Sequence, residues 1–278
     1  MTVSVFRVRK PCAETFSPDT DTNHGHFFFK NMIQIRNLHH DYPDGTRALK
    51  GIDLTISDGE FLLLCGPNGS GKTTLIRLIS GLLKPTTGSV HVNGLDPIHD
   101  SREVRRLVGL VFQDPDSQIV GETVKEDVAF GPENLGLPVG EITERVDWSL
   151  RVMGLEDLSE KPCHLLSGGE KRRLAIAGVL AMRPRIILFD EPFSFLDYPG
   201  IQEVLKHMVG LHREGHTLVV STHDVEKVIA HVDRIAILND GDLKLAGPSE
   251  ELLTKLSQFG IRPPCYALLG AKKISWLE

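Results

Sequence analysis

The sequence lacks any long apolar run. No stretch of its 278 residues approaches the about 18 consecutive apolar residues that a membrane-spanning helix requires. The composition is otherwise ordinary for a soluble globular protein, with 41% apolar and 24% charged residues. If the protein serves a membrane process, another chain must therefore supply the membrane part.

Cysteine and excess basic charge are scarce as well. The four cysteines are far apart and include no CxxC pair, which argues against both a disulfide framework and a zinc site. The formal net charge is −6 at pH 7, so no overall basic field is available to attract nucleic acid. We therefore expect a protein of the reducing cytosol with no nucleic-acid partner.

A glycine-rich loop is the most informative stretch that the chain does contain. Residues 66–74 read Gly-Pro-Asn-Gly-Ser-Gly-Lys-Thr-Thr, which fits the phosphate-loop pattern of Gly, four residues, Gly-Lys and then Ser or Thr. An apolar run of strand length, 61–65, precedes the loop, and apolar residues at helical spacing follow it. This is the strand, loop and helix context that the motif requires, so we predict that the protein binds a nucleoside triphosphate.

Each part of this loop has a predicted role. The glycines let successive backbone N–H groups turn inward around a polyphosphate, and the following helix adds the positive end of its dipole. Lys72 is expected to reach the β- and γ-phosphates, and the Thr73 hydroxyl is expected to bind Mg²⁺. The predicted phosphate-binding residues are Gly66, Pro67, Asn68, Gly69, Ser70, Gly71, Lys72, Thr73 and Thr74.

The remaining periodicities predict an α/β fold. Alternating apolar residues and turn signals between 33 and 92 indicate an antiparallel β layer around the phosphate-loop strand. A strand ends at Gln113, and a mainly helical stretch covers about 123–161. Apolar strands at 186–191, 217–221 and 235–238, with helices between them, indicate a parallel sheet. The predicted fold is thus a P-loop NTPase parallel-sheet core with an antiparallel β subdomain and an inserted helical subdomain at about 114–166.

Three segments are expected along the chain. Residues 1–31 are rich in small polar residues without periodicity, which predicts a disordered extension or a start upstream of the true initiator, Met32. His24 and His26, with Cys12, are an alternative metal set, but no ligand cluster follows at metal spacing. The main domain is expected at 32–247, and a C-terminal helical tail at 248–278.

Two carboxylates end the apolar strand that begins at Ile186. Asp190, delivered by a buried strand, suits a Mg²⁺ ligand, either directly or through a water molecule. Glu191 is a candidate general base for the attacking water. Tyr42, in the loop after the first predicted strand, is a candidate for stacking on a purine, although a half-buried loop residue is an equally good interpretation.

The chain resembles the ATP-binding-cassette ATPases, which are the motor subunits of membrane transporters. Six features carry the resemblance, and they occur along the chain in the order typical of that family. The resemblance covers about 32–247, and its most specific element is Leu-Ser-Gly-Gly-Glu at 166–170, because other phosphate-loop families lack it. The other five features are the aromatic Tyr42, the phosphate loop, Gln113 at a strand end, the acidic strand ending at Asp190-Glu191, and His223 in Ser221-Thr222-His223-Asp224.

The resemblance implies a role for each matching residue in binding and hydrolysing ATP. Tyr42 would stack on the adenine, and Thr73 and Gln113 would complete the Mg²⁺ shell, with Asp190 holding a water of that shell. Glu191 would polarise the attacking water.

Two further matches concern the γ-phosphate. His223 would contact it within the same subunit. Ser167, Gly168 and Gly169 would bind the γ-phosphate of a second subunit's ATP at a helix N-terminus. Two ATPase subunits would then be joined head to tail by ATP, and the helical subdomain would receive the membrane partner.

A narrower resemblance surrounds Gln113. The sequences at 111–118 and 123–134 resemble the energy-coupling-factor group of importers, which take up cobalt, nickel or water-soluble vitamins. The cobalt and nickel members are the most similar. This implies an ATPase at the cytoplasmic face of the membrane, in a homo- or heterodimer, with a transmembrane coupling subunit and a substrate-binding membrane subunit. The ATPase does not touch the cargo, so the cargo stays open.

Other classes fit less well. A small phosphate-loop GTPase would explain Asp197-Tyr198-Pro199-Gly200 as DxxG, but no NKxD motif is present. A soluble cassette acting on DNA or ribosomes usually has two cassettes or long coiled-coil insertions. A catalytically silent regulatory module is disfavoured because Lys72, Glu191 and His223 are all present. An ATPase of another type of ABC transporter is the alternative nearest to the preferred interpretation.

Overall fold

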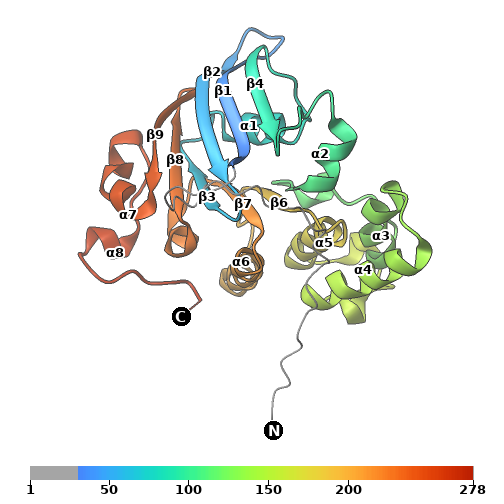
Figure 1. The fold of residues 1–278 in the computed structure, drawn as a ribbon. Coiled ribbons are helices and arrows are strands. Elements are labelled where there is room, and N and C mark those ends of the chain that lie inside the picture. Colours follow the sequence, from blue (N-terminus) through green and yellow to red (C-terminus); the bar gives the residue numbers. More distant parts are fainter. Residues whose placement is uncertain (1–30, 278) are drawn as a thin grey trace, which may run out of the picture.

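Two β-sheets meet around the phosphate-loop strand in the computed structural model, which describes residues 31–277 (Figure 1). The first sheet is antiparallel and has the order β2-β1-β4. The second has the order β5-β6-β7-β3-β8-β9, in which only β9 runs antiparallel to its neighbour. The strands are β1 (Asn31–Asp41), β2 (Arg47–Ser57), β3 (Phe61–Cys65), β4 (Thr87–Val92), β5 (Val108–Val111), β6 (Ile186–Asp190), β7 (Thr217–Thr222), β8 (Arg234–Asn239) and β9 (Asp242–Pro248).

The parallel part of the second sheet is covered on both faces, as its composition requires. Every residue of β3, β6 and β7 is buried, and these strands are nearly continuous apolar runs rather than alternating ones. Strand β3 lies between β7 and β8. The phosphate loop therefore begins at the carboxyl edge of the sheet, where ligands of open α/β sheets bind.

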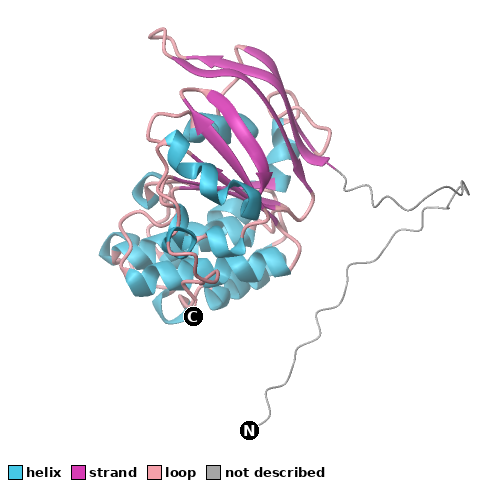
Figure 2. Cartoon of the chain, turned by 90° about the vertical axis from the view of Figure 1, so that its left-hand side faces the viewer, coloured by secondary structure: helices cyan, strands magenta, loops and turns pink. Residues whose placement is uncertain are grey.

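Most of the helices lie on the side of the six-stranded sheet away from the antiparallel layer (Figure 2), whereas α1 packs between the two sheets. Helices α3, α4 and α5 pack on one another at one end of the molecule, and α7 and α8 lie at the other end (Figure 1). The helices are α1 (Lys72–Ile79), α2 (Ser101–Leu107), α3 (Val124–Asn134), α4 (Val139–Val152), α5 (Gly168–Ala181), α6 (Tyr198–Arg213), α7 (Ser249–Leu252) and α8 (Cys265–Leu268).

Reciprocal capping boxes start the two helices that bracket the helical subdomain. Thr123 and Glu126 form one box at α3, and Ser167 and Glu170 form the other at α5. In each box the hydroxyl accepts from the backbone of the glutamate, and the glutamate accepts from the backbone of the cap, which satisfies two otherwise free N–H groups. Ser167 and Glu170 have the Ser-x-x-Glu spacing that such a box requires, so the start of α5 can be recognised from the sequence.

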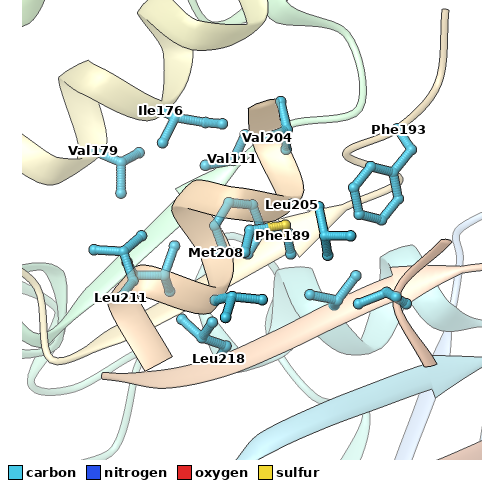
Figure 3. Packing of buried hydrophobic residues seen from close by; sticks show 14 of the residues in the cluster. Val111, Ile176, Val179, Phe189, Phe193, Val204, Leu205, Met208, Leu211 and Leu218 are labelled. Carbon is cyan, nitrogen blue, oxygen red and sulfur yellow. The ribbon is translucent and has the colours of Figure 1, made fainter. Parts of the chain in front are cut away.

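Two apolar clusters form the core. One lies between the antiparallel layer, α1 and one face of the six-stranded sheet. The other lies between the opposite face and the helices, where Leu205 and Met208 of α6 pack over Phe189 of β6 and Leu218 of β7 (Figure 3). Burial of this kind, at roughly 25 cal/mol per Å² of apolar surface, dominates the stability of such layers.

The α/β fold is confirmed, but the structure differs from the sequence prediction in two places. The helix expected between β7 and β8 is two short 3₁₀ turns, at Val225–Lys227 and Ile229–His231. The antiparallel edge strand β9 was not predicted, although Asp240 and Gly241, both with positive φ, form its hairpin turn.

The structure does not test the predictions for residues 1–31 or the predicted domain limits. The predictions for residues 1–31, including the possible metal set of His24, His26 and Cys12, lie outside the described residues apart from Asn31. The domain limits at 32 and 247 stay predictions. Within 31–277, no helix has both the length and the apolar character needed to cross a bilayer.

We expect Leu205→Ala to lower the free energy of unfolding by about 2–5 kcal/mol, because Leu205 is fully buried and the truncation leaves a cavity. Chemical denaturation measures the change. Leu268→Ala is the matched control, since Leu268 is 60% exposed and its loss should cost little. Equal effects of the two substitutions would contradict the packing described for α6.

Candidate nucleotide-binding site

The phosphate loop joins β3 to α1 and is shaped by close backbone contacts. A Cβ atom at Gly66 would lie 2.0 Å from the carbonyl oxygen of Leu238, which no side chain can tolerate. Gly71 has a φ of 103° and immediately precedes the first residue of α1. The glycines are therefore required by the fold at these positions, and the backbone N–H groups at the start of α1 stay free to meet an anion.

Lys72 is the buried cation of this loop. It is only 6% exposed, and its Nζ donates to the carbonyl oxygens of Gly66 at 2.8 Å and Pro67 at 3.1 Å. Burial lowers the pKa of Lys72 from its usual value, while the nearby carboxylate of Glu191 acts in the opposite direction. Its ammonium group thus lies over the loop, beside the negative charges at the end of β6.

Three oxygen-bearing side chains meet at the end of β6. Asp190 is 5% exposed, and its Oδ1 accepts from the Thr73 hydroxyl at 3.1 Å and from the Ser221 hydroxyl at 2.6 Å. Hydroxyl, carboxylate and carboxamide oxygens are ligands that Mg²⁺ prefers, and Gln113 lines a cavity with Thr73 and another with Asp190. The donor set therefore fits Mg²⁺. The sequence predicted no role for Ser221, although Ser221 is the first residue of the Ser221-Thr222-His223-Asp224 motif.

Glu191 is held in place from three directions. Its Oε2 accepts from the Thr222 hydroxyl at 3.0 Å, and its Oε1 accepts from the backbone N–H of His223 at 3.1 Å. The His223 ring is also bonded through Nδ1 to Oε1 at 2.9 Å. Because the carboxylate only accepts when ionised, Nδ1 is then the protonated ring nitrogen.

The backbone of Glu191 is unusual as well. Its φ of 45° is in the left-handed region, which costs a non-glycine residue about 1–3 kcal/mol and is frequent at functional sites. This bend follows directly after β6, and the Glu191 N–H donates to the Ser221 carbonyl at 3.0 Å. The carboxylate is 7% exposed and lies at the cleft together with His223. Thr222, a further contact, was also missed at the sequence level.

One cleft of about 580 Å³ brings most of the predicted residues together. Tyr42 lines this cleft and is partly buried, and its hydroxyl lies 3.1 Å from the Thr74 hydroxyl. Its ring meets the edge of His40 at a centroid distance of 4.8 Å. The cleft is lined by Tyr42, Thr46, Arg47, Ala48, Asn68, Gly69, Ser70, Gly71, Lys72, Thr73, Thr74, Gln113, Glu191, His223 and Asp240.

Ser167, Gly168 and Gly169 are not part of that cleft. They line a separate cavity of about 440 Å³ together with Leu196 and Asp197. Gly168 is exposed and Gly169 is half-buried, and a Cβ atom at either would meet nothing within 4 Å in this chain. Packing within the chain therefore does not explain these two glycines.

A buried phosphate loop, an oxygen-donor cluster and a fixed glutamate at the carboxyl edge of a mostly parallel sheet define a P-loop nucleoside triphosphatase. Among residues 31–277, no group of three or more His, Cys, Asp or Glu side chains is arranged to hold a metal ion. A Mg²⁺ ion with few protein ligands, completed by phosphate oxygens and water, is compatible with this arrangement.

Comparisons with known proteins refine this class. Residues 49–194 match the sequence profile of the family described as ABC transporter. The energy-coupling factor transporter ATP-binding protein EcfA of Methanocaldococcus jannaschii is 45% identical over 226 residues, covering 80% of this chain and 81% of the relative. The cobalt import ATP-binding protein CbiO of Syntrophus aciditrophicus is 45% identical over 244 residues, covering 86% of this chain and 87% of the relative.

Solved structures are similar over most of the fold. The CbiO1 protein of Clostridium perfringens, described as part of the ABC transporter complex CbiONQ, superposes with a TM-score of 0.74 at 37% identity, covering 87% of this chain and 99% of that one. A dimeric ATP-binding cassette in a post-hydrolysis state with ADP and Pi has a TM-score of 0.71 at 32% identity, covering 78% of this chain and 99% of that one. The chain therefore belongs to the ABC transporter family, as an ATP-hydrolysing, energy-coupling-factor type of ATP-binding subunit.

We expect Lys72→Ala to weaken binding of ATP by roughly ten- to a hundredfold, the effect of losing one charged hydrogen-bond donor. Fluorescence titration with a labelled ATP analogue measures the affinity. Lys244→Ala is the control, because Lys244 pairs only with Asp242 on the strand β9. Unchanged affinity in Lys72→Ala would contradict the role assigned to this cation.

Proposed function

We propose that this chain is the ATP-hydrolysing subunit of an energy-coupling-factor importer that drives uptake of a transition-metal ion, cobalt or nickel, or of a vitamin across the cytoplasmic membrane. The observation that carries the proposal is the similarity to EcfA and CbiO at 45% identity over at least four fifths of the chain. The name of the CbiO relatives favours cobalt. The alternative is an ATPase of another ABC transporter, or a soluble ABC ATPase not tied to transport.

ATP would lie in the cleft between Tyr42 and the phosphate loop. Tyr42 would stack on the adenine, and the loop N–H groups together with Lys72 would hold the phosphates. Mg²⁺, held by Thr73, Gln113 and a water on Asp190, would neutralise charge that develops on the β- and γ-phosphates.

Glu191 would orient the attacking water and accept its proton. Thr222 and His223 support this role because their hydrogen bonds fix both carboxylate oxygens. His223 is the more exposed partner, with 55% of its side chain accessible, so its ring can also contact the γ-phosphate. A carboxylate that is fixed before the reaction needs no reorganisation when the water attacks.

The γ-phosphate would be closed over by a second subunit. Ser167, Gly168 and Gly169 lie at the exposed N-terminus of α5, away from this chain's own phosphate loop. The backbone N–H groups of Gly168 and Gly169 in the first turn of α5 suit an anion, and the missing side chains of these two glycines let it approach. The partner is either a second copy or a related ATPase subunit, and ATP would join the two head to tail.

The membrane partner is proposed to dock where the helical subdomain begins. A groove of about 790 Å³ lies there and is lined by Phe112, Gln113 and Asp114. Two apolar side chains on its wall are unusually exposed, Leu82 at 57% and Phe195 at 92%. A cytoplasmic helix of the transmembrane coupling subunit would cover them. This chain would then lie at the cytoplasmic face of the membrane, with a substrate-binding membrane subunit in the same complex.

We expect Glu191→Gln to retain ATP binding, to lower kcat by about 10²- to 10⁴-fold, and to accumulate an ATP-bound dimer. The amide keeps the size of the carboxylate but is a poor proton acceptor. Phosphate release and size-exclusion chromatography in Mg-ATP measure the two effects. Glu214→Gln, on the exposed end of α6, is the control. Near-normal turnover in Glu191→Gln would remove Glu191 as the base.

Uptake by the native cells tests the transport function. Cells that lack this chain should lose uptake of radiolabelled cobalt or nickel, and the unaltered chain but not Glu191→Gln should restore it. Loss of vitamin uptake with normal metal uptake would assign a vitamin instead. Normal uptake of both classes would show that the chain does not serve an importer of this group.

A further inference from the structure

A buried arginine joins the signature helix to the segment that carries Gln113. Arg172, in the second turn of α5, is 1% exposed and is the largest of the fully buried side chains between 31 and 277. Its Nη1 donates to the carbonyl oxygen of Phe112, and its Nη2 donates to that of Gln113, each at 2.6 Å. The planar guanidinium thus binds two consecutive carbonyl groups at the end of β5 at once.

A second contact ties the same segment to α5. The side-chain oxygen of Gln118 accepts from the N–H of Phe112 at 2.9 Å, and its amide group donates to the carbonyl of Ala175 at 2.9 Å. Both backbone polar groups of Phe112 are therefore bound by side chains that belong to, or are attached to, α5. The end of β5 cannot move relative to this helix without breaking these bonds.

Packing at the position of Arg172 does not require a charged side chain. Burial lowers the pKa of its guanidinium from the usual value, and only the more distant charges of Asp114 and Asp190 act the other way. Its bonds are to neutral carbonyl groups, and Nε has no hydrogen-bond partner. Apolar residues commonly replace buried charges without loss of stability, so packing alone does not account for this arginine.

We propose that Arg172 is a positioning residue that couples the two half-sites of the chain. It lies four residues, or about 6 Å along the helix axis, from Gly168 at the N-terminus of α5. Movement of Ser167–Gly169 toward a partner's ATP would therefore carry the Gln113 backbone with it. The Gln113 carboxamide would reach Mg²⁺ only when α5 is correctly placed. This inference rests on the proposed role of Gln113 in metal binding.

Comparing ATP affinity with and without Mg²⁺ tests the coupling in the full chain. For Arg172→Met, we expect the gain in ATP affinity on adding Mg²⁺ to fall about tenfold, while the affinity in EDTA changes less than twofold. Arg172→Lys, which keeps the charge but can serve only one carbonyl well, should lie between. Lys171→Met is the matched control, because Lys171 joins the same helix to Asp116 of the same segment through an exposed pair.

Gln113→Ala separates the possible failures. If Gln113→Ala lowers the Mg²⁺-dependent gain and neither Arg172 variant does, the coupling role is wrong while the metal role stands. If Gln113→Ala has no effect on the gain, the metal role and the inference built on it are both overturned. Equal losses of affinity with and without Mg²⁺ in Arg172→Lys, with a lower Tm, would show that Arg172 is merely structural.

Discussion

The pairing of β6 with β7 is the constraint on which the site depends. In this parallel register Asp190 lies opposite Ser221, and the adjoining pairing of β3 with β7 sets Cys65 opposite Thr222. Three strands thus end at the same level, so the phosphate loop, the two carboxylates and the polar end of β7 face one another. Because side chains alternate across a strand, a slip of one residue would turn Asp190 away from Thr73 and remove the oxygen cluster.

The second organising feature is the separation of the two phosphate-binding elements. The phosphate loop opens into one cleft, and Ser167–Gly169 line another at the start of α5. Under the proposed function, a single chain would supply one half of each of two sites. The contacts of Arg172 and Gln118 with the end of β5 link these halves mechanically, since they attach the backbone beside Gln113 to the helix that begins at Gly168. Such a link between rigid elements is a physical route for coupling between subunits.

Local patterns were sufficient for most elements. The continuous apolar runs of β3 and β6 depend on neighbouring residues alone, and the sequence predicts both strands correctly. The segment after β7 was predicted wrongly as a helix, because Val225, Val228, Ile229 and Val232 have helical spacing. All four are buried, and the chain forms two 3₁₀ turns to bury them in a short connection.

The sequence by itself determined the chemistry of this protein: a phosphate loop, a strand ending in two carboxylates and a signature segment with its own cap. Each is a short contiguous pattern whose residue types and spacing are dictated by backbone geometry and charge. Only the tertiary structure decided which residues meet. The hydrogen bonds of Ser221 to Asp190, of Thr222 to Glu191, and of Arg172 to Gln113 join residues about 30 to 60 positions apart. Such contacts depend on strand register and helix packing, which no local pattern encodes.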